Sequence, residues 1–246
     1  MSFLDKLSAA QHRNNSRLCL SLDVELSRLP APLVRVDDPM FPFARSIVEA
    51  TRDLVCAYQI DLGYFLSEGA AGMIALERIT RYSPENIPII LDAKFGGLDH
   101  SADRYARGAF EAYRADAVTF GTLPNRSTIE AFLKFQDRAV FLPGDDIQAA
   151  IAQARIYRER SDGSCGIRVE LERLSDLAEI EADVPVIISA QNEWDGQTVH
   201  LIRDFIKSHP LSIVDGGSAV LYKSSREDYA EAVRRAVSTN RRRISE

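Results

Sequence analysis

An acid and a base stand two residues apart near the middle of the chain, in "LDAKFGGL" (91–98). Side chains two residues apart on a β-strand point to the same face, so Asp92 and Lys94 would face one another if this apolar stretch is extended. A carboxylate beside an ammonium favours the charged form of the lysine and prepares it for proton transfer. The spacing alone also fits a structural ion pair, so the place of the pair in the fold has to decide between the two interpretations.

Further polar residues lie at the ends of other apolar, β-rich stretches. Asp23 ends the first stretch, Gln59 and Asp61 lie on the second, Gln191 follows the seventh, and Asp215, Gly216 and Gly217 end the eighth. If these stretches are parallel strands of one sheet, their carboxyl ends meet at one edge. The pattern therefore predicts a single polar site built from several strands.

The elements that would position this site alternate along the whole chain. Eight stretches are typical of strands: 18–23, 57–65, 88–95, 117–121, 139–143, 166–171, 185–190 and 211–217. Between them, apolar residues recur at helical spacing, as in 43–54 and 74–82. Without a linker or an internal repeat, this alternation predicts an α/β protein with one closed (β/α)8 TIM barrel over residues 1–246.

Composition narrows the class of protein. The 246 residues are 46% hydrophobic, enough for one substantial core, and the net charge of −6 leaves no broad surface for nucleic acid. The three cysteines are far apart and lack metal-ligand spacing, so we expect small buried residues in a reducing compartment and no metal. We find no signal region and no apolar stretch of ~20 residues, and we expect a soluble cytoplasmic protein without a membrane partner.

The segment "LDAKFGGLDHSADRYARGAF" (91–110) resembles the orotidine 5′-monophosphate decarboxylase family, whose signature is Asp-x-Lys-x-x-Asp. The similarity continues in order through "SRLCLSLDVELSRLP" (16–30), "DAVTFGTLPNRSTIEAFL" (116–133), "VIISAQNEWD" (186–195) and "GGSAVLY" (216–222). It implies a barrel enzyme that needs no cofactor, in which an array of Asp and Lys opposes the substrate carboxylate and a Lys protonates the carbanion. It also implies a homodimer with shared active sites.

Four residues match positions to which the family gives a role. By resemblance, Asp92 is the first acid of the array and Lys94 its proton donor. Asp23 corresponds to an aspartate that binds ribose, and Gln191 to a glutamine that bridges base and phosphate. The resemblance thus implies that Lys94 and Asp92 are catalytic and that Asp23 and Gln191 bind substrate.

Three other family positions carry different residues. Gln59 stands in place of the strand-two lysine, Gly97 in place of the second acid, and Ser218 in place of the phosphate-binding arginine. Losing one cation and one anion breaks the alternation of charges and weakens the repulsion that would drive decarboxylation. Ser218 offers only a neutral hydroxyl, so we expect weaker phosphate binding, although Gly216 and Gly217 could still present backbone N–H groups to an anion.

Residues near the altered positions could compensate for these losses. Asp99 could supply the missing carboxylate, or it could cap the helix expected to begin near Ser101. Arg126 could bind a phosphate or carboxylate from the loop after the fourth strand, or it could lie on the surface. We include Gln59, Asp99, Ser101, Arg126 and Ser218 among the candidate substrate-binding residues.

Two further features each allow two interpretations. Arg168 and Glu170 share a face of the sixth strand and could form a polar pair in the site or an internal structural pair. Trp194 could cover a ligand or pack in the core.

Three hypotheses about function follow. The first, which we favour, is a divergent enzyme that acts on a pyrimidine nucleoside, nucleotide or analogue by proton transfer or decarboxylation through Asp92 and Lys94. The second is a non-catalytic binding or regulatory protein, and the third is a true orotidine 5′-monophosphate decarboxylase with an atypical site. A homodimer is expected, and a heteromer whose other subunit supplies the missing residues stays open.

Overall fold

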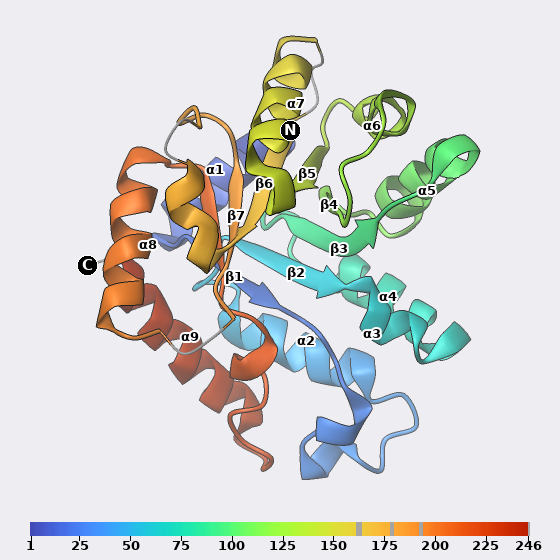
Figure 1. Ribbon diagram of the computed structural model, residues 1–246. Coiled ribbons are helices and arrows are strands. Elements are labelled where there is room, and N and C mark those ends of the chain that lie inside the picture. The colour runs from blue at the N-terminus through green and yellow to red at the C-terminus, as the bar shows by residue number, and fades with distance from the viewer. Residues whose placement is uncertain (161–163, 178–179, 192–193, 246) are drawn as a thin grey trace.

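A computed structural model of the chain describes residues 1–160, 164–177, 180–191 and 194–245. Eight parallel strands close into a barrel in sequence order, as Figure 1 shows. They are β1 (Leu18–Ser21), β2 (Ala57–Asp61), β3 (Ile89–Phe95), β4 (Ala117–Phe120), β5 (Ala139–Pro143), β6 (Ser164–Glu170), β7 (Val186–Ser189) and β8 (Ser212–Asp215). The predicted (β/α)8 barrel is confirmed.

Helices surround the strands on the outside of the barrel (Figure 1). They are α1 (Phe3–Asn14), α2 (Met40–Thr51), α3 (Leu62–Leu66), α4 (Gly69–Tyr82), α5 (Ala102–Arg107), α6 (Arg126–Leu133), α7 (Ile147–Arg160), α8 (Gly196–Ser208) and α9 (Tyr229–Ser245). Short 3-10 turns at the strand ends include η3 (Asp99–Ser101), η6 (Leu171–Leu177) and η7 (Ser218–Val220). The last turn of α9 is basic, with Arg242 and Arg243.

The barrel interior is filled by small and medium apolar side chains. Cys19, Ala57, Ala117 and Ala139 form one cluster with larger neighbours, and α1 contributes Phe3 and Leu7 to it. A second, larger cluster packs the helices against the outer faces of the strands. The three cysteines are free and buried, as expected of small core residues.

The N-terminal end of the barrel is held by an ionic cluster. The Asp116 carboxylate accepts hydrogen bonds from Lys6 Nζ at 2.6 Å, from Arg138 Nη1 at 2.8 Å and from the backbone N–H of Ile89 at 2.9 Å. Because Lys6 lies on α1 and Arg138 precedes β5, the cluster ties α1 to the barrel. Two cations and a backbone N–H therefore hold one buried carboxylate.

The second strand is shorter than its sequence predicts. The stretch 57–65 was expected to be extended, but β2 ends at Asp61 and α3 follows at once. The reason is local, because the Asp61 side chain accepts a hydrogen bond from the Gly63 N–H at 2.8 Å and caps α3. This early end leaves Asp61 at the C-terminal rim, beside Asp92 in the β2–β3 register.

Candidate active site

The end of β3 is irregular, and this irregularity presents Lys94. The register with β4 shifts between Leu91 and Phe95, and Lys94 adopts a left-handed backbone conformation with φ 49°. Thr119 of β4 supports the bend, since its hydroxyl accepts from the Lys94 N–H at 3.1 Å and donates to Asp92 Oδ1 at 2.6 Å. The Lys94 side chain is 52% exposed whereas that of Asp92 is 3% exposed, so the ammonium can reach a ligand and the acid beneath it is shielded from water.

Lys94 lies between two carboxylates. Its Nζ is 3.4 Å from Asp92 Oδ2 and donates a hydrogen bond to Asp61 Oδ2. Burial is the largest single influence on Lys94 and lowers its pKa, but the hydrogen bonds and charges of Asp61 and Asp92 together outweigh burial and raise that pKa. The structure therefore brings together the predicted pair and adds Asp61, which the sequence places on a strand end but does not connect with Lys94.

Arg168 completes a row of alternating charges. Its Nη1 lies 2.8 Å from Asp92 Oδ1, and its side chain is 13% exposed. Burial opposes the charge of the guanidinium, but Asp92 and Asp215 outweigh it and raise the pKa of Arg168. Both interpretations joined Arg168 to Glu170, but the hydrogen-bonded partner of Arg168 is Asp92, and the Glu170 side chain is exposed.

Asp23 lies on the β1 side of the same rim. Its carboxylate accepts from the Asp61 N–H at 3.0 Å, and Tyr222 donates to its backbone carbonyl at 2.8 Å. Burial raises the pKa of the Asp23 carboxyl to about 7; the Asp61 N–H opposes this rise, and the charges of Asp215, Asp61 and Asp92 add to it. The group can therefore change its charge close to neutral pH.

Gln59 faces β8 and not Lys94. Its Nε2 donates to Asp215 Oδ2 at 2.9 Å, and Ser21 and the Gly217 N–H donate to Asp215 Oδ1 at 2.8 and 2.9 Å. Asp215 is fully buried, and this burial raises its pKa. Gln59 is almost wholly buried, so it is not open to a ligand. The N–H of Gly217 is already donated to Asp215, so the anion site expected from Gly216 and Gly217 is not fully open.

The loop after β3 lies to one side of the charge row. Gly97 has φ 59°, and together with Asp99 it lines a cavity of about 210 Å³ that also includes Thr122 and Leu123. Asp99 accepts from Asn125 Nδ2 at 3.3 Å, and the N-cap of α5 is Ser101; the acids that act on Lys94 are Asp61 and Asp92. Ser101 precedes α5 as expected, but its hydroxyl donates to the Leu98 carbonyl at 2.6 Å.

The remaining candidate residues lie in three places: on the surface, in the core and at the ends of the strands. Arg126 is 73% exposed and pairs with Glu130 on α6, which supports its surface interpretation. Trp194 is buried and donates from Nε1 to the Ala190 carbonyl at 2.8 Å, which supports packing in the core. Gln191 lies against Gly217 at the ends of β7 and β8, and Ser218 begins η7 beside it.

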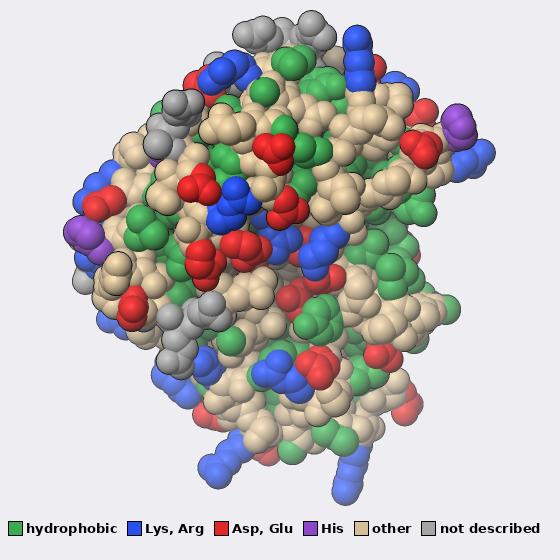
Figure 2. Space-filling view, in the orientation of Figure 1, with side chains coloured by type: hydrophobic (Ala, Val, Ile, Leu, Met, Phe, Trp, Pro, Cys, Tyr) green, Lys and Arg blue, Asp and Glu red, His purple; other side chains and the backbone are tan. Residues whose placement is uncertain are grey.

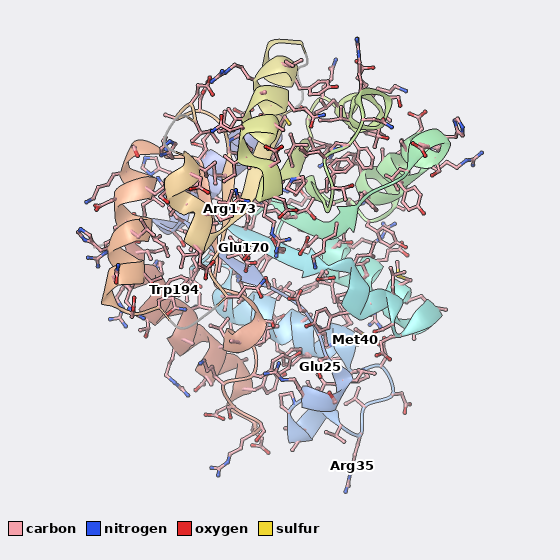
Figure 3. The ribbon with its side chains drawn as sticks, viewed as in Figure 1. Glu25, Arg35, Met40, Glu170, Arg173 and Trp194 are labelled. Carbon is pink, nitrogen blue, oxygen red and sulfur yellow. The ribbon has the colours of Figure 1, made fainter. Side chains whose placement is uncertain are left out.

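Acidic groups outnumber basic groups at this rim. Within the described ranges, Lys94 and Arg168 lie near five acids: Asp23, Asp61, Asp92, Glu170 and Asp215. Figure 2 shows red and blue side chains intermixed near the middle of this face, and Figure 3 places Glu170 and Arg173 there, with Trp194 nearer α8. Within the described ranges no group of three or more His, Cys, Asp or Glu is suited to a metal ion, and no helix is long and apolar enough to cross a membrane.

The chain is similar in sequence to orotidine 5′-phosphate decarboxylases. No family model matches the chain. Orotidine 5′-phosphate decarboxylase of Ralstonia pickettii is 33% identical over 270 residues, covering 100% of this chain and 99% of the relative. The enzyme of the same name from Herpetosiphon aurantiacus is 30% identical, covering 95% and 94%.

Solved structures show the same fold. The OMP decarboxylase of Leishmania donovani aligns with a TM-score of 0.72 at 22% identity, covering 97% of this chain and 99% of that one. The UMP synthase of the same organism aligns with a TM-score of 0.75 at 21% identity, covering 100% of this chain and 57% of that one.

Proposed function

The chain belongs to the orotidine 5′-phosphate decarboxylase family, and from this membership we propose that it is a divergent enzyme of that family, acting on a pyrimidine nucleoside, nucleotide or analogue. The proposed chemistry is decarboxylation or proton transfer without a cofactor. One observation carries the proposal: a half-exposed Lys94 ammonium lies at the C-terminal mouth of the barrel between two carboxylates. In this fold that mouth is the place where catalytic groups lie.

In a decarboxylation, the bond between the ring carbon and the carboxylate breaks and its electron pair stays on the ring carbon. Carbon dioxide leaves, and Lys94 transfers a proton from Nζ to the carbanion. Asp92, beneath the ammonium, would oppose a substrate carboxylate placed near it and stabilise the protonated lysine before the reaction. The neutral amine then regains a proton from solvent, to which Lys94 is open.

The groups around Lys94 support a polar ligand. We assign the hydroxyl groups of a sugar to Asp23, because its carboxyl can donate or accept a hydrogen bond near neutral pH. Gln191, Gly216 and Ser218 lie at the ends of β7 and β8, where a phosphate or its replacement would be bound. Weak retention of phosphate is consistent with the neutral hydroxyl of Ser218 and with the engaged N–H of Gly217.

The first experiment is a ligand panel with the purified chain. Thermal unfolding is measured with orotidine, uridine, cytidine and their 5′-monophosphates, and products are analysed for each stabilising compound. We expect one pyrimidine compound to raise the unfolding temperature and to be turned over, and turnover to disappear in Lys94→Ala. The matched control is Lys134→Ala, which removes a lysine from a surface pair with Asp103.

Other outcomes of the panel distinguish the alternatives. Stabilisation without turnover would favour a non-catalytic binding protein, an interpretation supported by the departures at Gln59, Gly97 and Ser218. Decarboxylation of orotidine 5′-monophosphate at high efficiency would favour a true member with an atypical site. A panel without any stabilisation would contradict a pyrimidine ligand.

We further propose a homodimer. An apolar groove of about 380 Å³ lies between α3, α4 and α5, next to the ends of β2 and β3. Leu66 and Tyr105 line it and are 55% and 47% exposed, and Figure 2 shows hydrophobic side chains gathered on that side of the molecule. Exposed apolar surface of this kind is typical of protein interfaces, and a second copy would bury it beside the site.

Sedimentation analysis tests the dimer. We expect Leu66→Asp to give a monomer, and Leu201→Asp, which alters an exposed leucine on α8, to leave the assembly intact. A wild-type monomer would contradict the proposal, whereas a dimer that forms only with a different chain would support a heteromer. The cytoplasmic location expected from the sequence stays a prediction.

A further inference from the structure

Four charged side chains form a row across the mouth of the barrel. Asp61 ends β2, Lys94 and Asp92 lie on β3, and Arg168 lies on β6. The contacts run in that order, from Asp61 to Lys94, from Lys94 to Asp92 at 3.4 Å, and from Asp92 to Arg168 at 2.8 Å. The signs therefore alternate along a row in which all groups come from one chain.

The buried end of the row is unfavourable for folding. The Nε of Arg168 is buried and has no hydrogen-bond partner among the described residues. Burying a guanidinium with an unsatisfied donor costs free energy, and buried ion pairs often stabilise a protein no more than apolar side chains of similar size. A contribution to stability is thus a poor explanation for Arg168, and its contact with Asp92 points to an electrostatic role.

Asp61 acts at the opposite, open end of the row. Its carboxylate caps α3 through the Gly63 N–H and also binds the Lys94 ammonium. One oxygen is therefore held by the backbone while the other holds Lys94, so the rigid start of α3 determines where the ammonium lies.

We propose that Asp61 and Arg168 are positioning residues for Lys94: Asp61 holds the ammonium at the mouth, and Arg168 shares the charge of Asp92 so that Lys94 is not bound to Asp92 alone. This inference rests on the proposed function, because it assigns to both residues the task of controlling the proton of Lys94. It adds two residues, on β2 and β6, to the pair on β3.

The surrounding groups do not reverse this assignment. Asp23 after β1, Asp215 of β8 and Glu170 of β6 are acidic, and Thr119 of β4 is neutral. Each of these groups is retained in every variant, so Asp61→Asn and Arg168→Met each remove a single charge from the same surroundings.

Removing the two residues should move the pKa of Lys94 in opposite directions. Asp61→Asn removes a carboxylate that favours the ammonium, so the pKa of Lys94 should fall, by on the order of one pH unit. Arg168→Met leaves the whole charge of Asp92 to Lys94, so the pKa of Lys94 should rise, by a few tenths of a pH unit. A purely structural role for either residue would not produce opposite signs.

Competitive acylation measures this pKa at single lysines. The chain has only five lysines, Lys6, Lys94, Lys134, Lys207 and Lys223, and trace acetic anhydride between about pH 7 and 9.5 acylates the neutral amine of each. Mass spectrometry gives the rate at Lys94 relative to the four other lysines. We expect acylation of Lys94 to be several-fold to about tenfold faster in Asp61→Asn and about twofold slower in Arg168→Met.

Two controls separate charge from folding. Arg138→Met removes a guanidinium from Asp116 at the other end of the barrel and should leave the rate at Lys94 unchanged relative to Lys134, Lys207 and Lys223; Lys6, which shares Asp116 with Arg138, is left out of this comparison. Arg168→Lys keeps the charge and should restore a rate close to that of the wild type. If Arg168→Met does not fold by circular dichroism, Arg168→Gln replaces it in the same comparison.

The result is independent of any substrate. Shifts of the same sign, or none, in Asp61→Asn and Arg168→Met would overturn the inference even if the enzyme is active. Opposite shifts in a chain that turns over none of the pyrimidine compounds would uphold the charge row and contradict only the proposed function. With an active enzyme, both variants should also lower kcat more than they raise KM, because they act on proton transfer.

Discussion

The two ends of the barrel carry charges in opposite arrangements. At the N-terminal end, Asp116 is surrounded by two cations and a backbone N–H, and α1 seals the interior with Phe3 and Leu7. At the C-terminal end, Lys94 and Arg168 lie among the carboxyl groups of Asp61, Asp92 and Asp215, and the pKa values of Asp23 and Asp215 are raised by burial. The Asp116 carboxylate is thus well bonded to cations, while the carboxyls of Asp23 and Asp215 are buried where their charge is disfavoured.

We connect the N-terminal end of the barrel with stability and the C-terminal end with chemistry. Two of the three buried side-chain atoms without a partner in the described ranges, Gln59 Oε1 and Arg168 Nε, lie at the C-terminal end, and the third is Arg17 Nε. Proteins tend to violate the rules of good packing at functional sites and to satisfy them elsewhere. The variants below test whether the two ends can be altered independently.

Lys94→Ala should have the largest effect. Loss of the proton donor is expected to lower turnover of the active substrate roughly 10²- to 10⁴-fold, the usual contribution of general acid catalysis. Because Lys94 is half exposed, the free energy of unfolding should change by less than about 1 kcal/mol. Single-turnover rates and urea unfolding measure both quantities, and a loss of activity below about tenfold would remove Lys94 from the mechanism.

Asp116→Asn should lower the stability of the fold without lowering turnover, the reverse of Lys94→Ala. It leaves Lys6 and Arg138 partly buried without their carboxylate, so the free energy of unfolding should fall by about 3–5 kcal/mol while the turnover of folded protein stays unchanged. Asp103→Asn, which breaks a surface pair, is the control and should cost less than about 1 kcal/mol. Equal losses in urea unfolding for the two variants would mean that the cluster at Asp116 does not stabilise the fold.

Asp23→Asn tests whether the charged form of a buried carboxyl at the mouth of the barrel destabilises the fold. The folded chain holds the Asp23 proton more tightly than the unfolded chain, because the pKa of this carboxyl is raised from 3.8 to about 7. Wild-type stability should therefore fall as the pH rises from about 4 to 7, and stay low above that range.

The variant removes this dependence. Between about pH 4 and 8, the wild type should lose on the order of 2–3 kcal/mol more than Asp23→Asn, measured by urea unfolding across the range. Asp215, whose pKa is also raised, is present in both proteins, and its charge is one of the causes of the raised pKa of Asp23. Parallel stability curves would show that Asp23 titrates in its ordinary range.

Ser2→Ala should have the smallest effect. Ser2 and Asp5 form a capping box at the start of α1, so losing the Ser2 hydroxyl should cost about 1 kcal/mol in thermal or urea unfolding. Turnover should be unaffected, because α1 closes the end of the barrel opposite Lys94. A change in kcat would indicate that the two ends are coupled.

Most of the fold is predictable because its signals are local. Apolar stretches and amphipathic helical patterns alternate eight times, and the eight strands follow, with errors mainly at their ends. The largest error, at β2, arises because a side chain caps the next helix, and Asp61 is compatible with either a strand or a cap. Gly97 and Ser218 are likewise visible in the sequence as departures, without any sign of what compensates for them.

By itself, the sequence determined the barrel and the common face of Asp92 and Lys94, because the two-residue period of a strand needs no tertiary information. Only the tertiary structure decided the neighbours of that pair. Asp61 reaches Lys94 from the adjacent strand, and Arg168 reaches Asp92 across a separation of 76 residues. The physical reason is that the closure of the barrel and the bend after Asp92 set these distances, and neither leaves a periodic pattern in the chain.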